Sequence, residues 1–481
     1  MNAGMILYLL GKILELTGGM MALPFIVGLI YHERSGMYFL VCGAVILATG
    51  FLLTHFTKPK NTSFYARDGF VVTALSWLLL SLAGSLPLFL SGEIPAFEDA
   101  LFECISGFTT TGASVVPAVE ELSRCVNFWR CFIQLIGGMG VLVFMLALLP
   151  STGGQDLYLM KAESPGPSVS KLAPKVRQTA YYLYIIYFVL TAAEAVCLVI
   201  AGAPLYDSIC TAFTTTSTGG FGVRNDSLGS YGPAVQYVIS VFLFLSGFNY
   251  NFFFCIWMKK FRDAFGSEEI RTYTGIFAVA TLFIAVKLLA DGVYGGEESF
   301  RHAFLQVGSI MTTAGYSSAD FDQWPAFCRE ILIFMMLIGG CAGSTCGGIK
   351  ISRVLIYLKT VGKEVSQLCH PRSVKVLKME GKAIPHSVLR SANIFLITYS
   401  CLFALSMLLI SLDGHDFTTN FTAVASAMGN IGPGFSLVGP THNFAFFSAP
   451  AKYVLMFDML AGRLELFPLL VLLSPATWRR N

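Results

Sequence analysis

Four short segments rich in threonine and glycine have the residue types needed to bind a dehydrated monovalent cation. Their small side chains leave the backbone carbonyls accessible, glycine permits a positive φ, and threonine adds a hydroxyl oxygen. Rings of such oxygens can replace the hydration shell of a monovalent cation. These first to fourth Thr/Gly segments are Thr110-Thr111-Gly112, Thr218-Gly219-Gly220, Thr313-Ala314-Gly315 and Asn430-Ile431-Gly432.

Each Thr/Gly segment closes a stretch of the same length, in which fifteen residues separate a leading apolar residue from the final glycine. The four stretches are 97–112, 205–220, 300–315 and 417–432. A helix of about 12 residues is only ~18 Å long, so each stretch is expected to dip into a membrane without crossing it. Extended backbone at that depth is tolerated where it lines a water-filled path. The alternative is that these segments are ordinary loops between helices. Four copies in the same register argue against it.

Composition places the whole chain in a membrane. Of its 481 residues, 55% are apolar and 13% charged, whereas soluble domains have about 25% charged residues. A soluble enzyme, a secreted domain and a disordered chain are therefore excluded. The net charge of +3 is too small to indicate a nucleic-acid partner. The twelve cysteines are scattered without a CxxC pair, and we expect them to be buried reduced thiols.

Ten apolar stretches are long enough to be spanning helices. Their connections alternate between basic and acidic, and the basic ones are 56–68, 150–180, 258–272, 359–390 and the C-terminal tail. The positive-inside rule therefore predicts both termini in the cytoplasm. The expected spans are 5–30, 37–55, 69–91, 126–149, 181–202, 233–257, 273–292, 328–358, 391–412 and 448–474.

The spacing of the Thr/Gly segments predicts the fold. An even number of spans separates successive segments, so each copy enters the membrane in the same orientation. We therefore expect an all-α polytopic membrane protein with two leading helices and four parallel helix–pore-loop–helix repeats around one pore. The expected units are 1–68 for the extension and 69–180, 181–272, 273–390 and 391–481 for the repeats.

A glycine-rich segment, 339–348, interrupts the eighth expected span. At about 1 kcal/mol per glycine against helix, it is predicted to form a loop halfway across the membrane. Close helix packing through small residues is the alternative. The segment contains Gly339, Gly340, Gly343, Ser344, Thr345, Gly347 and Gly348.

Arg463 lies in the middle of the tenth expected span. A guanidinium at the membrane centre costs about 2.5–3.5 kcal/mol on insertion scales, so it should face water or a partner. A structural ion pair with Asp458 or Glu465 remains open. Among the other intramembrane charges, Lys12 and Glu15 are expected to pair at i, i+3, and Glu194 and Lys287 are expected to have packing roles.

The four Thr/Gly segments resemble degenerate potassium-channel filters fused into one chain, as in the Trk/Ktr/HKT superfamily of potassium transporters. With two extra spans before the first repeat, the chain is most similar to the membrane subunit of bacterial Trk systems. The first segment departs from the pattern in having Ala113 after its glycine, and the fourth has Asn430-Ile431. In plant members, serine at the first glycine accompanies Na⁺ transport, so Gly112 favours K⁺.

The resemblance implies roles for residues and partners. Segment 339–348 would be a gating loop beneath the filter, and Arg463 would project into the pore as a barrier to cations. K⁺ would be bound at the filter, with Rb⁺ and Na⁺ as alternative ions. The protein would be a homodimer in the lipid of the bacterial inner membrane. The chain has no nucleotide motif of its own, so ATP, ADP or an NAD-type nucleotide would bind a cytosolic regulatory subunit.

Gated potassium uptake driven by membrane potential is therefore the leading interpretation. The alternative is a secondary transporter, either a cation symporter or a carrier of an organic solute. Such folds usually show inverted repeats and a charged site at the midplane, which this sequence lacks. The chain carries no HExxH or other catalytic motif, and we expect it not to be an enzyme.

Overall fold

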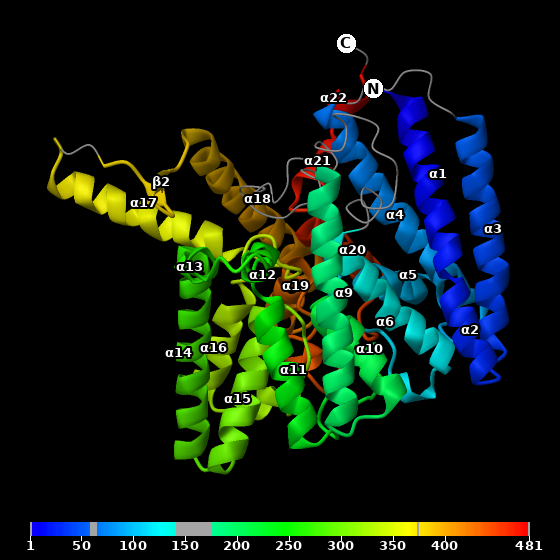
Figure 1. Cartoon of the computed structure of the whole chain (residues 1–481), viewed down its shortest axis with the longest axis horizontal. Coiled ribbons are helices and arrows are strands. Elements are labelled where there is room, and N and C mark those ends of the chain that lie inside the picture. Colours follow the sequence, from blue (N-terminus) through cyan, green and yellow to red (C-terminus); the bar gives the residue numbers. More distant parts are fainter. Residues whose placement is uncertain (1, 58–64, 141–175, 373–374, 480–481) are drawn as a thin grey trace.

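The computed structural model describes residues 2–57, 65–140, 176–372 and 375–479 (Figure 1). Three helices precede the first repeat: α1 (Ala3–Met20), α2 (Ala22–Ile30) and α3 (Ser35–Phe56). The helices of the first two repeats are α4 (Ala66–Leu90), α5 (Phe97–Phe108), α6 (Arg124–Met139), α9 (Val176–Ile200), α10 (Leu205–Thr216), α11 (Pro233–Ser246) and α12 (Tyr250–Trp257), followed by α13 (Phe261–Gly266).

The third repeat contains α14 (Glu268–Ala290), α15 (Gly296–Met311), α16 (Ala326–Met336) and α17 (Ile351–Cys369). A short hairpin, β1 (Lys378–Met379) and β2 (Lys382–Ala383), leads to the fourth repeat. That repeat contains α18 (His386–Ile410), α19 (Phe417–Gly429), α20 (Ala449–Arg463), α21 (Phe467–Leu473) and α22 (Pro475–Trp478). Single 3-10 turns lie at Val119–Glu121, Phe321–Gln323, Ser411–Asp413 and Ser436–Val438.

The expected all-α polytopic architecture is confirmed. Within the described residues, six helical stretches are long and apolar enough to cross a membrane, and a bent pair makes a seventh. The start of α1 and the C-terminal helix α22 lie at the same end of the bundle, and α17 with the hairpin projects sideways (Figure 1). The six are Ala3–Ile30, Ser35–Phe56, Arg67–Leu90, Ala180–Ile200, Glu268–Ala290 and His386–Asp413.

Among the described residues, three of the expected spans bend sharply or break, in addition to the short interruption at Met21 between α1 and α2. Stretch 233–257 bends by 93° between α11 and α12. Stretch 328–358 is broken between Met336 and Ile351, and its second helix continues into the expected loop 359–390. Stretch 448–474 breaks after Arg463, because Glu465 and Leu466 have φ of 53° and 69°. The prediction of one continuous helix over 448–474 is therefore wrong, and Arg463 is the last residue of α20.

Other expectations fall partly outside the described residues. Of span 126–149, only the part up to Gly140 is described, where α6 has already ended at Met139. Most of the basic connections 56–68 and 150–180 also lies outside the described residues.

The N-terminal helices pack through glycines. A Cβ atom at Gly18 of α1 would lie 2.6 Å from the Gly43 carbonyl oxygen of α3, and one at Gly50 of α3 would lie 2.7 Å from the Gly11 carbonyl oxygen. Such close backbone approach is typical of helix pairs in membranes. Gly19, the next residue along α1, has nothing within 4 Å of its Cβ position.

We therefore expect Gly18→Leu to separate α1 from α3 and to lower stability by about 1–3 kcal/mol, the usual cost of overpacking. Gly19→Leu is the matched control and should melt like the wild type. The measurement is the thermal unfolding midpoint of both variants in detergent. Equal midpoints for the two leucine variants would contradict this account of the packing.

Candidate functional site

The four Thr/Gly segments share one unusual backbone conformation. Each has positive φ at its first and third residues: 54° and 79° in the first segment, 55° and 75° in the second, 58° and 85° in the third, and 54° and 103° in the fourth. A β-branched residue at positive φ is a genuine outlier, and such strain clusters at functional sites. Asn430, the departure from the pattern, preserves this geometry because asparagine tolerates the left-handed conformation.

Each segment follows the C-terminal end of a half-length helix. The helices are α5, α10, α15 and α19, and each ends one or two residues before a segment begins. The carbonyl end of a helix carries partial negative charge, so four such ends favour a cation near the segments.

At the N-terminal end of α19, away from the ring, Asp416 accepts a hydrogen bond from the Thr419 amide at 3.2 Å. Hydrogen bonds from the Thr419 side chain and backbone lower the pKa of Asp416.

The four segments form a closed ring. A Cβ atom on the final glycine of each segment would collide with the middle carbonyl oxygen of the next segment in chain order, and the fourth returns to the first. The segments therefore surround a single axis, each in contact with two neighbours. The distances from the Cβ position of the glycine to the carbonyl oxygen are 2.2 Å for Gly112 and Gly219, 1.7 Å for Gly220 and Ala314, 1.9 Å for Gly315 and Ile431, and 2.9 Å for Gly432 and Thr111.

Side chains behind the ring hold its backbone. Gln134 of α6 donates to the Gly219 carbonyl at 2.8 Å and accepts from the Phe221 amide at 3.1 Å. Ser426 donates to the Gly432 carbonyl at 2.5 Å. These bonds fix the backbone of the second and fourth segments.

A buried ion pair braces the chain after the first segment. Glu103 of α5 and Arg130 of α6 pair at 2.6 Å with side chains 0% and 1% exposed. Glu103 also accepts from the Val115 amide at 3.1 Å, and Arg130 lies 4.3 Å from the centre of the Phe221 ring. The sequence interpretation overlooked both residues. The signal was available, since a charge inside an apolar span usually has a function.

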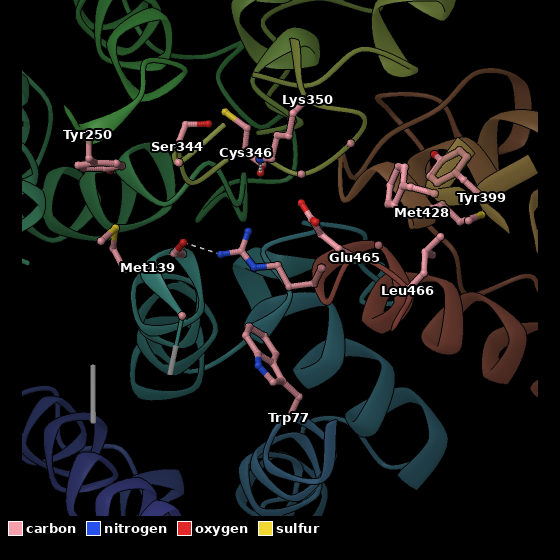
Figure 2. Close-up of a pocket in the computed structure, with 18 of the residues that line it drawn as sticks. Trp77, Met139, Tyr250, Ser344, Cys346, Lys350, Tyr399, Met428, Glu465 and Leu466 are labelled. Carbon is pink, nitrogen blue, oxygen red and sulfur yellow. Dashed lines mark hydrogen bonds between the residues drawn. The ribbon is translucent and has the colours of Figure 1, made fainter. Parts of the chain in front are cut away.

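Two cavities lie at opposite ends of the ring. One, of about 130 Å³, is lined by all four final glycines together with Arg130. The other, of about 80 Å³, is lined by Met428, which precedes the fourth segment, and by residues of loop 337–350. In Figure 2, Ser344, Cys346 and Lys350 lie on one side of this inner cavity and Trp77 on the other, with Glu465 between them.

Loop 337–350 lies directly against the inner end of the ring. Its predicted break from helix is confirmed, because α16 ends at Met336 and α17 begins at Ile351. Thr345 donates to the Thr216 carbonyl at 3.2 Å, and the Gly347 amide donates to the Thr313 hydroxyl at 2.7 Å. A Cβ atom at Gly347 would lie 2.3 Å from the Gly429 carbonyl oxygen. The loop thus contacts three of the four repeats.

The base of this loop is clamped. Ile338 and Ile349 form a parallel bridge, and the Gly339 amide donates to the Ile349 carbonyl at 2.9 Å. Buried Glu269 of α14 accepts from the Ala342 and Ser352 amides at 2.7 and 3.1 Å. The loop is therefore a closed excursion held at its two ends, with its tip under the ring.

Arg463 contacts backbone carbonyls on two sides of the inner cavity. It donates to the Thr345 carbonyl of the loop at 2.7 Å and to the Gly137 and Gly138 carbonyls of α6 at 2.5 Å each. The carboxylates considered as partners have other contacts. Asp458 accepts from Ser406 at 2.7 Å, and Glu465 pairs with Arg353 at 2.5 Å. The arginine thus joins the loop to α6.

The remaining intramembrane charges are also placed. Lys12 and Glu15 form the predicted pair at 2.6 Å. Lys287 pairs with Asp291 at 2.8 Å, at the C-terminal end of α14. Glu194 is fully buried beside α10. No group of three or more residues able to hold a metal through His, Cys, Asp or Glu side chains occurs in the part of the chain that the structure describes.

Four half-length helices around a ring of backbone segments, with a cavity at each end, define a multi-pass membrane protein of the channel-like, four-repeat class. A family model named TrkH, described as "Cation transport protein", matches residues 35–480. The chain belongs to this TrkH family.

Known proteins are similar over the whole chain. The Trk system potassium uptake protein TrkH of Salmonella typhimurium is 35% identical and covers 98% of both chains. The protein of the same name from Halomonas elongata is 34% identical and covers 100% of both. The crystal structure of the potassium transporter TrkH from Vibrio parahaemolyticus matches with a TM-score of 0.89 at 34% identity, covering 100% of both chains.

The Glu103–Arg130 pair gives a test of how the ring is braced. Glu103→Leu should destabilise the protein by about 3–5 kcal/mol, because it leaves Arg130 buried without its carboxylate. The double variant Glu103→Leu/Arg130→Met should recover most of that loss, since no buried charge remains. Thermal unfolding in detergent measures both. A double variant no more stable than the single one would contradict the charge-burial explanation.

Proposed function

We propose that this protein carries K⁺ into a bacterial cell through the ring, driven by the membrane potential. The observation that supports this most is the ring itself, in which four strained segments meet around one axis at the carbonyl ends of four helices. Backbone carbonyls of these segments would replace the hydration shell of K⁺, or of Rb⁺ in an assay. The relatives are named for potassium uptake, which supports K⁺ over Na⁺ as the physiological ion.

The ring also favours this mechanism over alternating access. A transporter with rocking halves binds its solute between two bodies that move relative to each other. Here each segment contacts both of its neighbours, so no plane through the axis divides the ring without breaking two of these contacts.

The direct test is ion uptake into proteoliposomes with an inside-negative potential. We expect the wild type to take up Rb⁺ and to prefer it over Na⁺, with no other solute present. No Rb⁺ uptake by folded protein, or uptake that requires an organic solute, would contradict the proposal.

We propose that loop 339–348 gates this path. Its tip occupies the inner end of the ring, through the bonds of Thr345 and Gly347 to Thr216 and Thr313. An ion leaving the ring would meet this backbone before reaching the cytoplasm. The clamped base of the loop leads directly into α17, so movement of α17 would be transmitted to the tip.

We further propose that the gate is controlled from outside the chain. α17 projects from the bundle (Figure 1), and its exposed apolar side chains, which include Leu358 and Leu368, suit contact with lipid or a second copy. The basic segment after it suits a cytosolic regulatory subunit carrying ATP, ADP or an NAD-type nucleotide. This assembly would be a homodimer in the inner membrane, with both termini in the cytoplasm.

Arg463 would act as a fixed positive charge at the inner cavity. Such a charge raises the energy of a passing cation by about 1 kcal/mol even when largely screened by water. Because the guanidinium also holds the Thr345 carbonyl, it would keep the loop tip in place. Both effects limit leak of cations when the gate is closed.

A filter variant follows from the collisions at the glycines. Gly220→Ser places a Cβ atom against the Ala314 carbonyl and strains the backbone at a φ of 75°. We expect the K⁺ concentration for half-maximal uptake to rise by about tenfold or more, since such strain costs about 1–3 kcal/mol. Gly232→Ser is the control, because its Cβ position is open. Unchanged K⁺ affinity in folded Gly220→Ser would contradict the filter assignment.

A pore-charge variant separates two roles of Arg463. Arg463→Ala should raise Rb⁺ flux by about fivefold, the rate equivalent of about 1 kcal/mol, while Arg463→Lys should stay close to wild type because the charge remains. Flux is normalised to reconstituted protein and compared with thermal stability. Slower flux together with a large loss of stability in the alanine variant would favour a structural role instead.

A further inference from the structure

The buried carboxyl group of Glu194 lies against the base of the second Thr/Gly segment. Glu194 is on α9, and its side chain is 0% exposed. One carboxyl oxygen accepts from the Thr216 hydroxyl at 3.1 Å, and the other has no hydrogen-bond partner in the described part of the chain. A buried polar group with unmet hydrogen bonds costs stability, so its presence at this point of the membrane calls for a role.

The position that Glu194 contacts is special to the second repeat. Two residues before the first positive-φ residue of each segment, the other repeats have a side chain that cannot donate a hydrogen bond. Only Thr216 has a hydroxyl there, and Glu194 accepts from it. The equivalent residues in the first, third and fourth repeats are Phe108, Met311 and Met428.

Thr216 also joins this carboxyl group to the loop under the ring. Its carbonyl accepts from the Thr345 hydroxyl at 3.2 Å, and the Thr345 carbonyl in turn accepts from Arg463 at 2.7 Å. Thr218, the first residue of the segment, donates to the same Thr345 hydroxyl at 3.3 Å. A continuous series of bonds thus runs from α9 through Thr216, the last residue of α10, to the loop tip and the end of α20.

We propose that Glu194 is a positioning residue for the second Thr/Gly segment, acting as the hydrogen-bond acceptor of Thr216. By fixing Thr216, it sets the backbone that coordinates the cation and the carbonyl that holds the loop tip. This inference rests on the proposed function of the ring as a potassium filter. What matters at position 194 is an acceptor of the right length, so glutamine can supply it and leucine cannot.

The experiment compares the Rb⁺ concentration for half-maximal uptake in proteoliposomes. Glu194→Leu and Thr216→Val should each raise it by about tenfold, the effect expected for one lost buried hydrogen bond, and Glu194→Gln should restore it to within about twofold. The double variant Glu194→Leu/Thr216→Val should be no worse than either single variant, because both remove the same bond.

Thr191→Val is the matched control on the same helix. Thr191 is buried and donates only to the Tyr187 carbonyl of α9, at 2.9 Å, so the same change there should leave the half-maximal concentration unaltered. Thermal unfolding midpoints are measured for all variants. If Glu194→Leu does not fold, the half-maximal Rb⁺ concentrations of Thr216→Val and Glu194→Gln still test whether the hydrogen bond sets the affinity.

Three results would overturn the inference while leaving the proposed function intact. The first is a half-maximal Rb⁺ concentration in Thr216→Val equal to that of the wild type. The second is a Glu194→Gln variant as impaired as Glu194→Leu. The third is a double variant in which the effects of the two single variants multiply. A lowered midpoint with unchanged Rb⁺ affinity would likewise reduce Glu194 to a packing role. Absence of Rb⁺ uptake by the wild type would contradict the proposed function itself, and with it the inference.

Discussion

The left-handed backbone at alternate residues of the four Thr/Gly segments is the constraint on which the rest of the structure depends. Three threonines hold a conformation that β-branched residues rarely adopt, and each such residue costs about 1–3 kcal/mol. The ring keeps this conformation because many contacts from the surrounding helices and from neighbouring segments hold its backbone in place. Glycine is required at the third position of each segment, where the neighbouring segment leaves no room for a Cβ atom.

Several polar side chains buried in the bundle hold the backbone of the ring and of the loop beneath it. Gln134 and Ser426 bond to segment backbone directly, and the Glu103–Arg130 pair anchors the chain after the first segment. On the inner side, Arg463 and Glu269 hold the loop through backbone groups. Lone polar groups are costly in a membrane, and these side chains bond to backbone where the chain is not helical.

Much of this arrangement could be predicted from the sequence, because it follows from spacing and composition. Apolar stretches, equal 15-residue intervals and a run of glycines predict spans, re-entrant helices and a broken eighth span. What could not be predicted depends on three-dimensional contacts. The break after Arg463 rests on positive φ at Glu465 and Leu466, which are ordinary residues in a helical pattern. Likewise, only the fold brings Arg130 to Glu103 and Glu194 to Thr216, since these partners belong to different helices.

The central claim is that cations bind inside the ring, and anomalous diffraction from crystals grown in rubidium chloride tests it most directly. The account predicts an anomalous peak on the axis, surrounded by the backbone of Thr111, Gly219, Ala314 and Ile431 from the four repeats. A ring without a peak, with Rb⁺ bound instead beside a buried carboxylate such as Asp458, would contradict it.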